Sequence, residues 1–271
     1  MTTLGEVGEL GLLAALERLG LVQGIENDVA VVDGLVVTQD MLVEDVHFRF
    51  DLLSWRELGA RAAAINISDL AASGADPVAL LVSLALPPET ELDDVLELYA
   101  GLKERGVAVR GGDTSRADRV LLSVTALGRS ERVPGRAGAQ PGDAVVVTGR
   151  LGGAGVAFRT GSLSPVPDRL QEGKRLAGVA TAMLDVSDGL APDAGHVAQR
   201  SGVRLAIELE RVPLAPGAEL DDLGFGEDYE LLATTPDPLD FAVIGRVEDG
   251  AGVELTLRGA PYSLAGWEHF R

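Results

Sequence analysis

Six aspartates of this chain lie in five short segments that are rich in glycine and small polar residues. The segments are Asn27-Asp28, Thr38-Gln39-Asp40, Asn66-Ile67-Ser68-Asp69, Gly111-Gly112-Asp113-Thr114 and Asp185-Val186-Ser187-Asp188-Gly189. Carboxylate oxygens suit Mg²⁺, which proteins usually hold with a few carboxylates together with the phosphates of a substrate. The pattern predicts a cage for divalent cations in a protein that handles a nucleotide.

Each aspartate taken alone also fits a structural role, because aspartate commonly caps helices and begins turns. Two of the segments are more specific. In Gly111-Gly112-Asp113 the glycines favour a close approach of the backbone to a ligand. Asp185-Val186-Ser187-Asp188 has two carboxylates and a hydroxyl where a strand is expected to end and a helix to begin. Such a junction offers free N–H groups to anions beside carboxylates for a cation.

The hydrophobic pattern predicts the elements that position these residues. Two apolar runs flank Asp33-Gly34, which is a strong hairpin signal. We expect the hairpin to bring Asp28 and Asp40 close together, with Thr38 and Asp40 on one face of the second strand. Residues 55–73 are typical of an alanine-rich helix, whose short polar stripe faces either a ligand or solvent.

The remaining pattern indicates an α/β (α+β) chain in two domains. In the first half a helix is expected within residues 1–23 and another from 92 to about 106, with strands at 78–86, 107–109 and 119–129. Residues 131–142 are rich in Gly, Pro and Arg and predict a boundary between domains 1–130 and 131–271. In the second half strands are expected at 144–148, 183–186, 203–209, 241–247 and 253–257, with helices after 149–155, over 169–182 and from 188 to 200.

Five further candidates have weaker signals, and two of them have two interpretations each. His47 either contacts a substrate phosphate or packs, and Arg136, in the boundary segment, is either exposed or clamps a phosphate. His196 is expected to be structural, and the role of His269 is left open. The acidic run Gly226-Glu227-Asp228-Tyr229-Glu230 is most simply a solvated turn or the start of a helix.

Charge and composition exclude several classes of protein. With 23 basic and 42 acidic residues the formal net charge is −19, which disfavours nucleic acids and anionic membranes as partners. The same charge would repel a bare nucleotide triphosphate, so such a ligand should arrive with Mg²⁺. Gly173-Lys174 is followed by Arg175, so the chain lacks a P-loop.

The sequence also bears on location. Cysteine is absent, which excludes disulfides and thiolate metal sites. No apolar run reaches the roughly 18 residues that a membrane helix needs, and the first residues lack the pattern of a signal peptide. We therefore expect a cytoplasmic protein.

The ordered motifs closely resemble thiamine-monophosphate kinases. The resemblance runs from about residue 24 to 270 and rests on the motifs Asp40-Met41-Leu42-Val43-Glu44, Asn66-Ile67-Ser68-Asp69-Leu70, Gly111-Gly112-Asp113-Thr114, Pro141-Gly142-Asp143, Asp185-Val186-Ser187-Asp188-Gly189-Leu190, Gly226-Glu227-Asp228-Tyr229-Glu230-Leu231 and Gly266-Trp267-Glu268-His269-Phe270. It implies the two-domain fold of aminoimidazole ribonucleotide synthetase, with an N-terminal mixed sheet that has helices on one side and a C-terminal α/β domain. It further implies a homodimer paired through the N-terminal sheets.

The same resemblance implies an ATP-dependent kinase that converts thiamine phosphate to thiamine diphosphate by direct transfer, with several Mg²⁺ ions and no nucleophilic side chain. The implied ligands of the metal are Asp28, Thr38, Asp40, Asp69, Asp113, Asp185 and Asp188. Contacts to ATP are implied for Gly112, Asp113, Arg136 and Ser187, and contacts to thiamine phosphate for His47, Glu227 and Trp267. Glu26-Asn27 stands where the family usually has Gly-Asp, which leaves the number of metal ions open.

Two alternatives remain at the level of sequence. One is another ATP-dependent enzyme of the same fold, such as an aminoimidazole ribonucleotide or selenophosphate synthetase, the latter disfavoured by the lack of cysteine. The other is a non-catalytic sensor of nucleotides or divalent cations.

Overall fold

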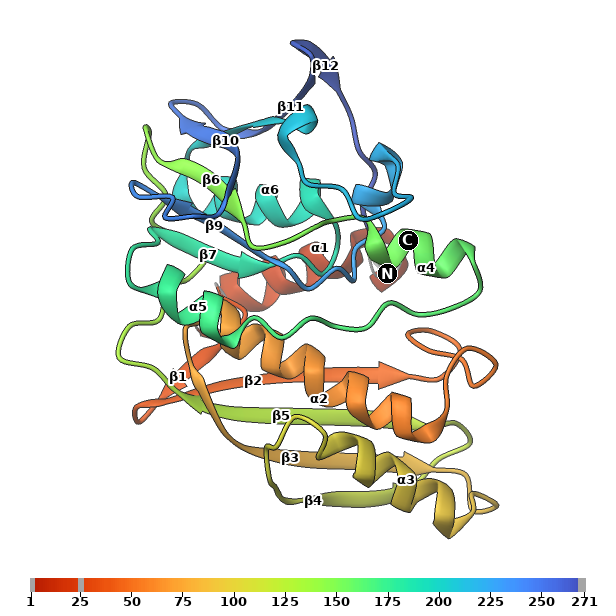
Figure 1. The fold of residues 1–271 in the computed structure, drawn as a ribbon. Coiled ribbons are helices and arrows are strands. Elements are labelled where there is room, and N and C mark those ends of the chain that lie inside the picture. Colours follow the sequence, from red (N-terminus) through yellow and green to blue (C-terminus); the bar gives the residue numbers. More distant parts are fainter. Residues whose placement is uncertain (1–2, 24–26, 268–271) are drawn as a thin grey trace.

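Two β-sheets organise the chain, as seen in a computed structural model that describes residues 3–23 and 27–267. The first sheet has five strands in the order β1-β2-β5-β3-β4, and the second has seven in the order β12-β11-β8-β10-β6-β9-β7. Figure 1 shows the sheets one above the other with helix α2 between them. Each half has its own cluster of buried apolar side chains. The predicted mixed α/β class is confirmed.

The first sheet is mixed, and its helices cover one face. Its strands are β1 (Ala30–Val32), β2 (Leu35–Val43), β3 (Asp76–Leu86), β4 (Val109–Arg116) and β5 (Leu121–Arg129), and its helices are α2 (Trp55–Ala72) and α3 (Leu92–Leu102). β3 and β4 are parallel, whereas the other neighbours are antiparallel. Leu80, Val82 and Leu84 of β3 are buried toward the helices, and Leu81 between them is exposed.

The Asp33-Gly34 hairpin forms as predicted. Val32 pairs with Leu35 across the two-residue turn, and both turn residues have positive φ, 48° and 77°. These angles are those of the turn that Asp-Gly favours between right-twisted strands. The hairpin places Asp28, just ahead of β1, beside the first half of β2.

Helix α2 begins at a capping box and then packs at very short range. Glu57 N donates to Ser54 Oγ, and Ser54 N donates to Glu57 Oε2 at 2.7 Å. A Cβ at Gly59 would overlap the Leu98 carbonyl of α3, and one at Gly101 would overlap the Arg56 carbonyl of α2. Glycine at both positions therefore sets the close crossing of the two helices.

We expect Gly59→Ala to lower the free energy of unfolding by about 1–3 kcal/mol, because the added methyl must push α3 away from α2. Chemical denaturation monitored by circular dichroism measures this change. Gly195→Ala in a later helix is the matched control, because no atom lies within 4 Å of a Cβ there. The control should be neutral or stabilising by up to about 1 kcal/mol. Equal stability of the two variants would contradict the packing argument.

The second sheet carries the remaining elements. Its strands are β6 (Ala144–Val147), β7 (Ala182–Asp185), β8 (Arg204–Glu208), β9 (Leu231–Thr235), β10 (Ala242–Glu248), β11 (Gly252–Leu257) and β12 (Ala260–Tyr262). The helices of this half are α4 (Gly153–Arg159), α5 (Leu170–Ala177) and α6 (Leu190–Ser201), with 3-10 turns at Leu209–Arg211 and Leu220–Gly224. The segment predicted as the boundary lies between β5 and β6.

The two halves are in extensive contact. Helix α1 (Leu4–Arg18) lies beside α6, and Arg200 NH1 is 3.4 Å from Glu17 Oε1. A Cβ at Gly173 of α5 would overlap the Ala71 carbonyl of α2. Among the described residues no helix is both long and apolar enough to cross a membrane.

Two expected elements differ from the structure, and two strands were not expected. The short strand predicted at 107–109 is instead β4, which extends through Gly111-Gly112-Asp113, because these residues pair with β3. The predicted helix over 169–182 is limited to α5 and ends before β7. Strand β9, between β6 and β7, and strand β12, at the edge of the second sheet, were not predicted.

Candidate active site

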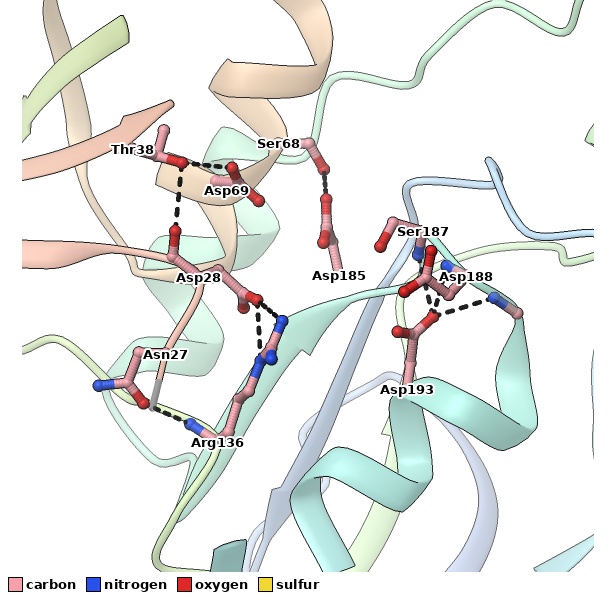
Figure 2. A network of polar contacts seen from close by, with 11 residues as sticks. Asn27, Asp28, Thr38, Ser68, Asp69, Arg136, Asp185, Ser187, Asp188 and Asp193 are labelled. Carbon is pink, nitrogen blue, oxygen red and sulfur yellow. Dashed lines mark hydrogen bonds and ion pairs between the residues drawn. The ribbon is translucent and has the colours of Figure 1, made fainter. Parts of the chain in front are cut away.

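Four carboxylates from separate segments lie close together, and Figure 2 shows three of them, Asp28, Asp69 and Asp185. Asp28 precedes β1, Asp40 lies in β2, Asp69 lies near the end of α2, and Asp185 ends β7. Asp69 is close enough to the other three for their charges to raise its pKa. The structure therefore brings together these four of the predicted metal ligands.

Neutral polar side chains hold the carboxylates in place. The Thr38 hydroxyl lies 2.5 Å from Asp69 Oδ2 and 3.1 Å from the Asp28 carbonyl oxygen. Ser68 Oγ donates to Asp185 Oδ2 at 2.5 Å and so joins α2 to β7. The predicted polar stripe of α2 is turned inward, since Asn66 and Ser73 are 0% and 2% exposed and Asp69 is half-buried. The interpretation of this stripe as a solvent-facing surface is wrong.

The environment of the carboxylates strongly disfavours their charge. Burial, followed by the charge of Asp28, raises the pKa of Asp40 to about 6 and that of Asp185 to about 7. Burial and then Asp40, Asp185 and Asp28 raise the pKa of Asp69 well above its usual value. A hard divalent cation would relieve this repulsion, and the donor set of carboxylate and hydroxyl oxygens fits Mg²⁺.

We expect the affinity for Mg²⁺ to fall as the pH is lowered through about 7 and then 6. The pKa values of Asp185 and Asp40 are raised in the metal-free protein, so below these values the two carboxyls carry protons that a cation must displace. Titration calorimetry with MgCl₂ in buffers of different ionisation enthalpy should show proton release near pH 6 that becomes smaller as the pH rises above 7. An affinity independent of pH over this range would contradict the expectation.

Arg136 supplies the positive charge nearest to the cage. Its Nε donates to Asp28 Oδ1 at 2.9 Å, and its NH2 forms an ion pair with the same oxygen. The backbone N–H of Arg136 donates to Asn27 Oδ1 at 2.9 Å, so Asn27 helps to fix this segment. Arg136 is half-buried rather than exposed. Glu26, the other residue of the sequence departure, lies outside the described residues.

The turn that follows β7 is organised by an aspartate that the sequence analysis did not single out. Asp193 Oδ2 accepts hydrogen bonds from the backbone N–H groups of Ser187, Asp188 and Gly189 at 3.0, 3.0 and 3.1 Å (Figure 2). The prediction of free N–H groups for anions at this junction is therefore wrong, because a carboxylate already occupies them. The sequence signal for this role was Asp193 itself, the acidic residue in the first turn of α6.

Asp188 lies next to this turn and faces His196 of α6. Possible ligand atoms of Asp188, Asp193 and His196 lie within 4.8 Å of one another, in the described part of the chain. Burial, followed by Arg136 and Arg200, lowers the pKa of His196 to about 4, so its imidazole is neutral. One oxygen of Asp193 is already committed to the three N–H groups.

Asp113 is placed apart from the other carboxylates of its own chain. The sheet register aligns Asp113 with Ser83 of β3, Ser123 of β5 and Met41 of β2. Asp40 is the neighbour of Met41, so the two aspartates project to opposite faces of the sheet. Gly112 has φ 151°, and a Cβ there would overlap the Val82 carbonyl, so its close approach is to β3.

Two of the three residues predicted to bind thiamine phosphate lie at the 187–189 turn. Glu227 N donates to the Ser187 carbonyl at 2.8 Å, and Trp267 N donates to the Asp188 carbonyl at 3.0 Å. Trp267 also lines a cavity of about 470 Å³ that includes Arg136 and Asp188. His47 lies in the turn after β2, where its Nδ1 accepts from Val43 N at 3.1 Å. His269 lies outside the described residues.

The acidic run that contains Glu227 is buried rather than solvated, so that interpretation was wrong. Asp228 is 8% exposed and accepts from Gly152 N at 2.6 Å and Ala154 N at 3.2 Å at the start of α4. Glu230 is 5% exposed and is bound by Arg169. Glu227 and Tyr229 both have positive φ, 56° and 51°.

The remaining contact of this run comes from α2. Arg61 NH2 lies 3.0 Å from Glu227 Oε2, and the Arg61 guanidinium lies over the Tyr229 ring, 5.8 Å from its centroid. Arg61, which sequence reasoning missed, therefore connects the first half of the chain to the segment that carries Glu227.

Comparisons with known proteins agree with this geometry. The fold is that of AIR synthase-related proteins, and residues 26–130 match the family model "AIR synthase related protein, N-terminal domain". The chain is 35% identical to the thiamine-monophosphate kinase of Aquifex aeolicus, covering 98% of this chain and 99% of the relative. It is 34% identical to that of Pyrococcus abyssi, covering 87% and 86%.

The solved structures agree as well. The structure of AaThiL complexed with AMPPCP and TMP matches with a TM-score of 0.90 at 34% identity and covers 99% of both chains. Hydrogenase maturation protein HypE, at 18% identity and a TM-score of 0.73, shares the fold. The chain belongs to the thiamine-monophosphate kinase family.

Proposed function

We propose that this chain transfers the γ-phosphoryl group of ATP to thiamine phosphate, giving thiamine diphosphate and ADP. The observation that carries the proposal is the buried carboxylate cage, found in a chain that matches thiamine-monophosphate kinases over almost its whole length. The similar structure of AaThiL contains AMPPCP and TMP, which supports ATP and thiamine phosphate as the substrates. We place the protein in the cytoplasm, where ATP is available.

Mg²⁺ fits the cage, because the donors are oxygens and four of them are carboxylates with one arginine beside them. Bound Mg²⁺ would neutralise charge on the phosphates as the phosphoryl group moves. We assign the metal ligands to Asp28, Thr38, Asp40, Asp69, Asp185, Asp188 and, through a second chain, Asp113. Thr38 is included among the proposed ligands because its hydroxyl lies beside Asp69.

The other residues bind and orient the two substrates. Arg136 would exchange part of its pairing with Asp28 for a phosphate of ATP, with Ser187 and Gly112 as further ATP contacts. Glu227 and Trp267, at the same turn as Ser187, would hold the cationic thiamine rings through charge and an aromatic face, and His47 would bind the acceptor phosphate. The acceptor phosphate is largely ionised near neutral pH, so direct transfer needs no strong base.

We further propose a homodimer that pairs through the first sheets. Met41 and Leu81, on the face opposite α2, are 52% and 38% exposed, and Asp113 projects from this same face. A second chain on this face would cover the apolar side chains. It would also bring Asp113 to the carboxylates of the partner chain, where Asp113 would act as a ligand. Sedimentation measurements on wild type and Leu81→Glu test the pairing.

A coupled assay of ADP release with thiamine phosphate, with and without Mg²⁺, tests the proposed activity, together with identification of thiamine diphosphate as the product. Turnover that needs both thiamine phosphate and Mg²⁺ is expected. Nucleotide binding without turnover would favour the sensor instead. Turnover with aminoimidazole ribonucleotide precursors alone would favour a synthetase of this fold.

A further inference from the structure

Asp193 occupies a place that resembles an anion-binding site. Three successive N–H groups, those of residues 187, 188 and 189, point at one oxygen of its carboxylate (Figure 2). Gly189 has φ 114°, which other residues rarely adopt, and this angle helps to turn the three groups inward. Convergent backbone N–H groups at the start of a helix are the usual cradle of a phosphate.

The carboxylate in this cradle belongs to the protein and is shielded from water. Asp193 is 2% exposed and lies on α6, whose first turn follows directly from Gly189. Burial, followed by the charges of Asp188 and Asp185, raises the pKa of Asp193, whereas the hydrogen bond from Asp188 N lowers it and so favours the carboxylate anion. A phosphate could reach these N–H groups if the Asp193 carboxylate were removed.

We propose that Asp193 is a positioning residue that acts as an internal anion. Its carboxylate fills the cradle at residues 187–189, fixes the Ser187 and Asp188 side chains, and makes the binding of a nucleotide phosphate beside this turn depend on a divalent cation. The inference rests on the proposed function, because it assumes that a phosphate-bearing substrate binds next to the cage.

Two substitutions of Asp193 separate the effect of filling the cradle from the effect of the negative charge. Asp193→Ala opens the three N–H groups and removes one negative charge. Asp193→Asn keeps an oxygen that can accept the N–H groups and removes the charge alone. Asp188→Asn is the matched control, because it removes a charge from the same turn while the cradle remains filled.

The test measures ATP binding by titration calorimetry in excess EDTA, together with kcat and KM for MgATP. We expect Asp193→Ala to bind metal-free ATP at least about ten-fold more tightly than wild type and more tightly than Asp188→Asn. We expect its kcat to fall at least about ten-fold, and Asp193→Asn to recover most of this loss. A purely structural role would leave metal-free ATP binding unchanged or weaker.

The proposal is overturned if folded Asp193→Ala, verified by circular dichroism, gains no metal-free affinity over Asp188→Asn. If Asp193→Ala does not fold, the same measurements on Asp193→Asn decide between support and refutation. Metal-free ATP binding at least as tight as in Asp188→Asn with kcat near wild type supports the proposal, and wild-type metal-free affinity overturns it. Absence of thiamine phosphate turnover in the wild type would refute the proposed function, whereas the EDTA titrations would still report on the cradle.

Discussion

Asp69→Asn is expected to lower turnover of thiamine phosphate at least about 100-fold while it raises the melting temperature of the metal-free protein. The loss of activity follows because Asp69, which lies among Asp28, Asp40 and Asp185, is a proposed ligand of the metal. The gain in stability follows because these buried carboxylates repel one another, and asparagine removes one of the charges. Coupled ADP release and thermal unfolding in EDTA measure the two effects.

The sign of the stability effect depends on pH. The pKa values of Asp40 and Asp185 are raised, so the stability of the metal-free protein from this site is present at low pH and is lost as the pH rises through about 6 and 7. The gain from Asp69→Asn should therefore be largest above pH 7. Asp33→Asn is the control, because asparagine tolerates the positive φ of this exposed hairpin residue. Loss of activity and stability together in Asp69→Asn would indicate a structural role instead.

Arg169→Ala is expected to lower the free energy of unfolding by roughly 3 kcal/mol, because it leaves the buried Glu230 carboxylate without its cation. Arg169 Nε and NH2 donate to the two oxygens of Glu230 at 2.5 and 2.6 Å, and Thr148 donates to one of them at 2.6 Å. The Arg169 side chain is 23% exposed, which places the expected loss at the lower end for a buried pair. Denaturant unfolding measures it.

Arg246→Ala is the matched control for this pair. Arg246 also pairs with a glutamate, Glu248, but its own side chain is 70% exposed. Water replaces such a partner at little cost, so the control should unfold like wild type. If Arg169→Ala and Arg246→Ala have equal stability, the Arg169–Glu230 pair does not contribute to the free energy of unfolding as expected. Arg169→Lys, which keeps the charge and loses the paired hydrogen bonds, should fall between them.

The sequence predicted those parts of the site that depend on local pattern. The Asp-Gly turn fixed the register of β1 and β2 and hence placed Asp28 near Asp40, and side-chain alternation placed Thr38 and Asp40 on one face. Helical spacing placed Asn66 and Asp69 on one stripe of α2. These inferences needed only neighbours along the chain, which is why they are confirmed.

Other features depend on contacts between distant segments. Strand β9 was missed because the acidic run before it gives a turn signal, and burial of Glu230 is possible only when Arg169 from another segment provides the charge. Gly112 was interpreted as a ligand approach, whereas the neighbour that requires glycine is the Val82 carbonyl of the adjacent strand. The role of Asp193 could not be predicted, because a sequence does not show whether the backbone N–H groups of a turn are free or already bound by a side chain.

The carboxylates of the cage come from both halves of the molecule. Asp28, Asp40 and Asp69 belong to the first sheet and its helix, whereas Asp185 ends a strand of the second sheet and is bridged to α2 by the Ser68 hydroxyl. A cation held by both sets would act as a noncovalent crosslink between the halves. Under the proposed function, release of the products would then require this crosslink to loosen, and the strength of ion binding would bear on the rate of turnover.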